Sequence, residues 1–198
     1  MKRIILTLVA VFSFGFVNAQ DGETKMNGFS EGDKFVEGSF SFRSGDVEDS
    51  WAFNPSMGYM LDDKWAIGGK LNFSGAEDIA NNKESRFGVT AFGRYYFLSL
   101  GASKSFNAYG EIGLGYTSVK EEPNGLPSTT DSQMNANIDL GLDYFFTPNW
   151  AATFKLANIV SYNSTNPENG SNSSDLNVNV NLFNNIFAQP QFGLLYRW

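Results

Sequence analysis

The chain has 198 residues, with 14 basic and 21 acidic side chains, no cysteine and no histidine. The absence of cysteine excludes disulfide bonds and thiolate metal sites, and the absence of histidine removes the side chain best suited to general-base catalysis near neutral pH. The net charge of −7 argues against nucleic-acid binding, for which a basic surface is expected.

Residues 1–19 have the pattern of a secretory signal peptide. Two basic residues precede an apolar stretch that ends in Val17-Asn18-Ala19, and cleavage is expected after Ala19. The apolar stretch is shorter than the roughly 20 residues of a membrane-spanning helix, which disfavours an N-terminal anchor. The remaining 12 basic and 21 acidic residues give the mature chain a net charge of −9. Residues 20–33 are polar and glycine-rich, and we expect a flexible periplasmic segment there.

From Lys34 to the C-terminus, apolar and polar residues alternate with a period of two in eight stretches. Between Met134 and Phe146, apolar residues occupy every even position and the residues between them are mostly polar. Such alternation predicts β-strands, and most stretches reach the 9–11 residues or so that a tilted strand needs to cross a bilayer. Strands are therefore expected at residues 34–43, 51–61, 65–74, 86–97, 106–119, 134–146, 150–162 and about 187–198.

Aromatic residues gather at both ends of the predicted strands. One set lies beside the shorter connections, and a second set lies near the longer ones, which are predicted at residues 75–85, 120–132 and 161–175. In bacterial barrels short turns face the periplasm, long loops face outward, and aromatic girdles lie at both membrane interfaces. A soluble β-barrel is the alternative, but it would leave these rings in water. The pattern predicts an all-β, antiparallel, up-and-down transmembrane barrel whose apolar side chains face lipid.

The alternation continues without a break from Leu176 to Trp198. This segment is too long for one crossing, and Pro190 would remove a hydrogen bond from a strand interior. Two separate strands would make nine, whereas bacterial barrels have even strand numbers. We therefore expect an eight-stranded barrel, with Leu176–Asn185 as an extracellular extension before the last crossing.

The end of the chain carries the most specific resemblance to a known family. Phe192, Leu194 and Tyr196 alternate toward the terminal aromatic residue Trp198. This ending, on a barrel pattern that covers residues 34–198, resembles the small outer-membrane β-barrel proteins of Gram-negative bacteria, the OmpA/OmpX-like group. The resemblance implies a location in the outer membrane and a C-terminal signal that the barrel-assembly machinery recognises. Trp198 departs from the phenylalanine that more commonly ends such chains.

Charged residues also fall on the inward parity of the predicted strands. An eight-stranded barrel has room for side chains and little else, so opposite charges there are expected to pair. We expect a packed interior in which these charges form a structural network with Tyr96, Tyr109 and Asn137. An ion path through the lumen is the alternative. The predicted network consists of Glu37, Arg43, Lys70, Arg94, Glu111, Asp139, Asp143, Lys155 and Arg197.

No catalytic, metal or cofactor site is expected. Asp139 and Asp143 are the one candidate carboxylate pair, but four residues along a strand separate them by about 13 Å, too far to share a proton. We therefore expect a monomeric, non-enzymatic barrel of structural or interaction type that displays extracellular loops. The alternative is a small pore or transporter for ions or small apolar molecules. The expected partners are outer-membrane lipid and lipopolysaccharide, with no nucleic acid.

Overall fold

The computed structural model describes residues 28–45, 48–101, 104–168, 170–178 and 191–198, which form nine β-strands. The expected signal peptide and residues 20–27 lie outside the described residues. No helix in the described ranges is long and apolar enough to cross a membrane. The strands are β1 Lys34–Ser44, β2 Glu48–Met60, β3 Trp65–Asp78, β4 Lys83–Leu100, β5 Phe106–Glu122, β6 Thr129–Phe145, β7 Trp150–Asn166, β8 Ser173–Val178 and β9 Gln191–Arg197.

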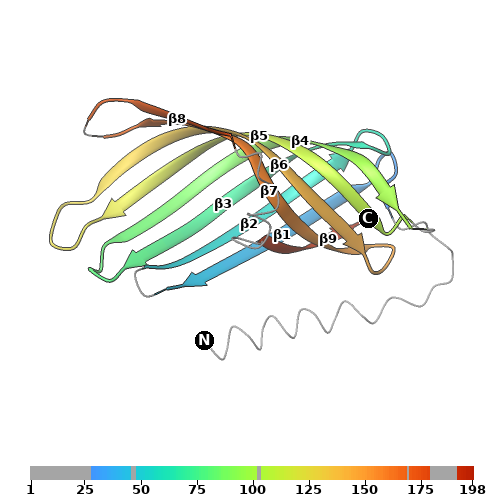
Figure 1. Ribbon diagram of the computed structural model, residues 1–198, viewed down its shortest axis with the longest axis horizontal. Helices are drawn as coiled ribbons and strands as arrows, with labels where there is room; N and C mark the ends of the chain where they lie inside the picture. The colour runs from blue at the N-terminus through green and yellow to red at the C-terminus, as the bar shows by residue number, and fades with distance from the viewer. Residues whose placement is uncertain (1–27, 46–47, 102–103, 169, 179–190) are drawn as a thin grey trace.

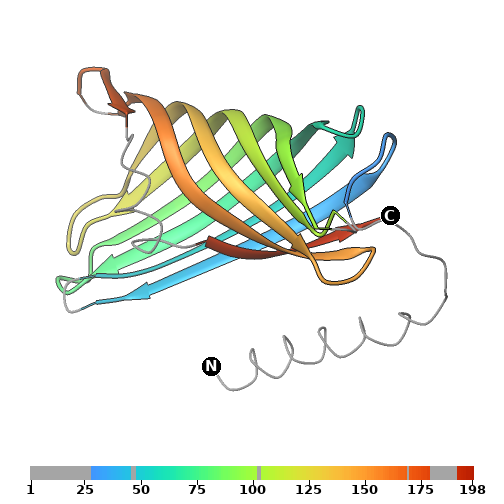
Figure 2. The same ribbon diagram turned by 45° about the vertical axis from the view of Figure 1, so that its right-hand side comes forward.

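Eight of these strands form a closed antiparallel ring (Figures 1 and 2). Consecutive strands pair from β1 to β7, and β9 closes the ring because it pairs with both β7 and β1. β8 lies outside this ring of eight and pairs with the other end of β7, where Val160 lies opposite Val178. The eight-stranded up-and-down barrel is therefore confirmed. β8 forms a hairpin with the end of β7 and lies outside the ring.

The two ends of the barrel differ in what lies there, since the segment before β1 and the end of β9 are at one end and the β7–β8 hairpin is at the other. We call these the periplasmic end and the extracellular end, following the arrangement of bacterial barrels. In Figure 1 the C-terminus marks the periplasmic end, and the β7–β8 hairpin projects from the opposite end. The N-terminal end of β1 and the C-terminal end of β9 meet at the periplasmic end, where Lys34 and Trp198 exchange two backbone hydrogen bonds.

Most strands are longer than the sequence pattern predicts. Strands β3 to β7 contain 14–18 residues, against the 9–11 or so that cross a bilayer. Much of the predicted loop at 75–85 is a hairpin in which Glu77 lies opposite Lys83. Outside the membrane both faces of a strand are polar, so the alternation disappears although the backbone ladder continues. The strands therefore carry the barrel wall into the extracellular space.

The outer surface of the barrel is apolar. Met57, Ile112 and Leu114 are each about 60% exposed, which suits side chains that contact lipid. Aromatic side chains pair along the periplasmic girdle, where Trp65 packs on Tyr95 with ring centroids 4.7 Å apart. The exposed rings near both ends match the two predicted girdles.

A local irregularity between β6 and β7 corrects the predicted parity of β7. The alternation places Asn158 on the lipid face, where an amide would be unfavourable. The register shifts between Ile138 and Asp139 and again between Leu140 and Gly141, and such β-bulges redirect side chains. Asn158 consequently points into the lumen and donates a hydrogen bond to Asp139 at 2.7 Å.

Candidate functional site

The periplasmic end of the lumen is closed by residues that precede the first strand. Phe29 is 6% exposed and packs on Phe35, Tyr96 and Phe145, with ring centroids 4.7–5.4 Å apart. The sequence predicts a flexible segment over residues 20–33. In the described part of that segment, residues 28–33, the prediction is wrong because these residues pack against the barrel. A single phenylalanine in a polar segment carries no periodic signal that would reveal this contact.

Several hydrogen bonds hold this N-terminal turn in place. The backbone of Gly32 and Asp33 is hydrogen-bonded to Met60 at the end of β2. The carboxylate of Asp33 accepts from the backbone N–H of Ser30 at 2.8 Å and pairs with Arg197 at 3.1 Å. The last turn before β1 is therefore fastened to both β2 and β9, and it places Phe29 below the lumen.

Glycines allow the aromatic rings above Phe29 to lie flat against the barrel wall. A Cβ atom at Gly58 would come within 2.1 Å of the Phe35 ring, and one at Gly141 would come within 2.1 Å of the Tyr109 ring. Phe35 and Tyr109 are almost completely buried. The rings fill the periplasmic half of the lumen because the facing strands present no side chain there.

A layer of charged side chains lies on these rings. Arg94 is 1% exposed, and its guanidinium contacts Glu111 at 2.7 Å and Glu37 at 2.9 Å. Arg94 also donates to the hydroxyl of Tyr96 at 3.2 Å, and Tyr96 donates to Asp143 at 2.9 Å. Every carboxylate of this layer thus has a positive charge or a hydrogen-bond donor beside it, as a buried charge requires.

The structure places the other predicted interior charges in three positions. Lys70 reaches into the Arg94 layer and pairs with Glu111 at 2.8 Å. Asp139 lies higher in the lumen, where Lys155 pairs with it at 2.7 Å. Arg197 is at the periplasmic end beside Asp33 and also donates to the backbone carbonyl of Pro148. The side chain of Arg43 lies outside the described part of the structure.

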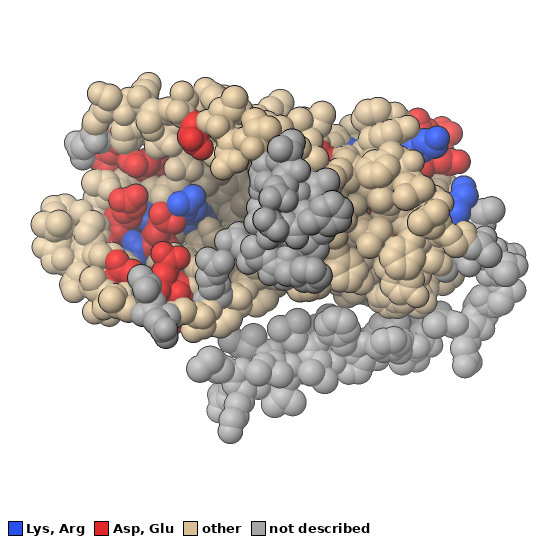
Figure 3. All heavy atoms as spheres, in the orientation of Figure 1, with Lys and Arg blue, Asp and Glu red and all other residues tan. Residues whose placement is uncertain are grey.

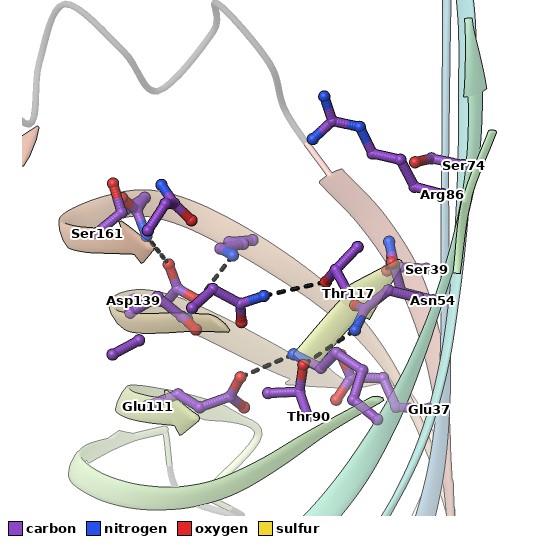
Figure 4. A pocket seen from close by; sticks show the side chains of 18 of the residues that line it. Glu37, Ser39, Asn54, Ser74, Arg86, Thr90, Glu111, Thr117, Asp139 and Ser161 are labelled. Carbon is purple, nitrogen blue, oxygen red and sulfur yellow. Dashed lines mark hydrogen bonds and ion pairs between the residues drawn. The ribbon is translucent and has the colours of Figure 1, made fainter. Parts of the chain in front are cut away.

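The extracellular half of the lumen is hollow, which corrects the expectation of a packed interior. A polar cavity of about 310 Å³ lies above the charged layer. Figure 4 shows Glu111, Asp139 and Ser161 on one side of it, and Ser39, Asn54 and Ser74 on the other. Inward-facing glycines allow neighbouring side chains to lie against the wall here, as Asn137 does at Gly113 and Asn135 at Gly115. Among the described residues, close packing of the interior is found in the periplasmic half.

Acidic side chains gather at the extracellular end of the barrel on the face drawn in Figure 3. Figure 3 shows Asp and Glu gathered there with a few Lys and Arg. In the β3–β4 turn, Asp78 accepts hydrogen bonds from the side chain and backbone of Asn82 and from the backbone of Ala80. These bonds, above all that from the Asn82 side chain, hold the pKa of Asp78 below its ordinary value.

The C-terminal residues line the last strand on its outer face. Trp198 is 50% exposed and stacks on Tyr196, which in turn packs on Trp150 of the neighbouring strand. Phe192 packs on Phe154 higher on the same pair of strands. The alternating ending is thus part of the lipid-facing surface and of the periplasmic girdle.

The ion pairs and hydrogen bonds of the charged clusters can stabilise the barrel. Asp139 accepts from Lys155, Asn137 and Asn158, whereas Asp143 lies in the Arg94 layer. The two carboxylates thus occupy different environments. Among the described residues, no cluster of three or more acidic side chains is placed to hold a metal ion. The arrangement can close the lumen and stabilise the barrel.

Comparisons with known proteins agree with this architecture. The N-terminal β-barrel domain of Pseudomonas aeruginosa OprF is 16% identical and has a TM-score of 0.52, with 86% of this chain and 100% of that chain covered. The outer membrane protein OprG from the same organism is 17% identical and has a TM-score of 0.50, with 86% and 98% covered. At these identities the likeness shows the fold alone. No protein with a curated description matches the sequence. A model of the outer membrane protein beta-barrel domain matches residues 6–194; because this match spans most of the chain, the protein belongs to that family.

Proposed function

We propose that this protein is a closed barrel that displays its extracellular end for interaction and does not pass solutes across the membrane. The observation that supports this proposal is the closure of the lumen at two successive levels. Phe29 and its neighbouring rings form the lower level, and the Arg94 layer forms the upper level. An ion crossing the barrel would have to displace both.

The extracellular end supports the display function. The strands continue beyond the length that crosses a bilayer, so that the barrel wall itself carries the connecting loops. The β7–β8 hairpin projects from this end in Figure 2. We propose that lipid and lipopolysaccharide surround the barrel, that its residues 1–19 are removed after export, and that it acts as a monomer without enzymatic activity.

The alternative is a small pore, and the hollow outer half of the lumen is the observation that favours it. Conductance of the refolded protein in planar lipid bilayers distinguishes the two functions. We expect no steady openings, and a sixteen-stranded porin in the same membrane provides the positive control. We also expect none from Phe29→Ala, because the Arg94 layer remains. Large, steady openings of the wild-type protein would refute the proposed function.

A further inference from the structure

We propose that the hollow extracellular half of the lumen is a binding cup for one small, neutral, polyhydroxylated molecule of sugar size. The inference rests on the closed lumen of the proposed function, because the closed floor makes this space a cup. Its volume of about 310 Å³ lies at the lower end of the range of roughly 300–1,000 Å³ for small-molecule sites. It therefore has room for one such molecule.

Most of the residues that line the cup have polar side chains. Of the described lining residues, only Tyr109 and Ala136 are apolar or aromatic. An apolar molecule would displace water from these polar groups without replacing its hydrogen bonds, which is unfavourable. The neutral polar members of the lining are serine, threonine, asparagine and glutamine side chains.

The charges of the lining are balanced and already paired. Three acidic residues, Glu37, Glu111 and Asp139, face three basic ones, Lys70, Arg86 and Lys155. Each has a partner within 3 Å, either in this set or in Arg94 and Glu84. A charged ligand would have to separate one of these pairs and leave a charge uncompensated, which is unfavourable. A neutral ligand meets no such cost.

Polar groups that can still form hydrogen bonds point into the cup. Gln133, Ser161 and Asn163 make no side-chain hydrogen bond within the described part of the chain. Asn72 and Asn135 each donate one N–H to a neighbouring threonine, at 2.9 and 3.0 Å, and each amide retains a second N–H and a carbonyl oxygen. Because a hydroxyl group both donates and accepts, this mixture of donors and acceptors complements a molecule with several hydroxyls.

The proposal is tested by titrating the full-length mature protein with sugars. The ¹⁵N-labelled protein is refolded in phosphocholine micelles, since maltoside detergents carry a sugar themselves, and the side-chain amide signals of asparagine and glutamine are followed by NMR. Glucose is compared with gluconate and glucosamine, which resemble it in size but carry a charge. We expect saturable shifts with glucose and none with the charged analogues at equal concentration.

Two variants with the same new side chain locate the site. Asn163 faces the cup, whereas the next residue, Ser164, lies opposite the lipid-facing Met134. We expect Asn163→Leu to weaken glucose binding about tenfold, the effect of losing one hydrogen bond and some space. Ser164→Leu should leave binding unchanged, and migration of the unheated protein on a gel shows that both variants fold.

Three outcomes would overturn the proposal. They are shifts that stay linear in glucose concentration, equal shifts with the charged analogues, and unchanged glucose affinity in folded Asn163→Leu. These results differ from a failure of the proposed function, which conductance alone reveals. A barrel that conducts steadily but still binds glucose saturably would refute the closed lumen and retain the polar site.

Discussion

The three carboxylates around Arg94 show how the lumen tolerates charge. Arg94 comes from β4, whereas Glu37, Glu111 and Asp143 come from β1, β5 and β6, so that one guanidinium joins four strands. Its neighbours Phe35 and Tyr109 offer their ring faces, with the Tyr109 centroid 4.0 Å from the guanidinium carbon. The interior is thus stabilised by ion pairs that share one guanidinium and by aromatic rings that exclude water from these pairs.

Removing Arg94 should therefore destabilise the barrel strongly. We expect Arg94→Met to lower the free energy of unfolding by about 3–5 kcal/mol, because it leaves buried carboxylates uncompensated. Arg86→Met is the matched control, since Arg86 pairs with Glu84 where both are about one-third exposed or more, and it should cost at most about 1 kcal/mol. Urea unfolding in lipid vesicles measures both.

The pair Arg94–Glu111 gives a second readout of the same layer. The double variant Arg94→Met/Glu111→Gln should lose less stability than the sum of the single variants, because the residues share one network. Equal losses in Arg94→Met and Arg86→Met, or simple additivity in the double variant, would place these side chains in water instead of a closed layer.

Strand β6 illustrates the two faces of a single element. Met134 and Ile138 are exposed on its outer face, whereas Asp139 and Asp143 are buried inside the barrel. Next to it, β7 keeps this division only because the bulge moves Asn158 inward. Each strand of this barrel is thus characterised by the side chains that it directs to lipid. The bulge in β7 is accommodated because it returns a polar side chain to the lumen.

A charge on the lipid face of β6 tests this division. Leu140 lies near the middle of the strand, opposite Gly110 and Ala157, and Leu140→Arg should lower stability by about 2–4 kcal/mol, as expected for arginine at the bilayer midplane. Asn137→Ala on the inner face should cost about 1 kcal/mol, because Asp139 retains Lys155 and Asn158. Unfolding in vesicles compares them, and equal losses would contradict the assignment of the two faces.

The whole molecule depends on contacts between the two ends of the described chain. Lys34 pairs with Trp198, and Asp33 contacts Arg197, 164 residues away in the sequence. The same region contains Phe29, so the closure of the ring and the closure of the lumen occur together at the periplasmic end. We propose that the C-terminal residues have an additional role before the ring closes, as the signal that the barrel-assembly machinery recognises.

Deleting Trp198 separates these two roles. The deletion should reduce insertion into the outer membrane in cells more than it reduces spontaneous refolding into detergent micelles, because only the cellular route recognises the C-terminal strand. Trp198→Phe is the control and should restore insertion, since the resemblance implies that an aromatic residue suffices. If both assays lose equally, or if the deletion variant inserts normally in cells, Trp198 is an interfacial anchor only.

The sequence by itself determined the barrel, the eight crossings and most of the described residues that face inward, although not Asn158. These properties follow from alternation, which is local: once a strand crosses lipid, each residue's side is decided by its parity. For this reason Arg94, Glu111 and Asp143 could be assigned to the lumen from the sequence alone. The extra length of the strands could not be predicted from the sequence, because the alternation ends where both faces of a strand are polar.

Only the tertiary structure decided how the lumen is filled. Which inward side chains meet depends on the register between strands, and therefore on the bulge in β7 and on the pairing of β9 with both β1 and β7. The position of Phe29 beneath the rings and the hollow above the charged layer arise in the same way. The position of Phe29 and this hollow depend on contacts between residues far apart in the chain. A local sequence pattern does not predict such contacts.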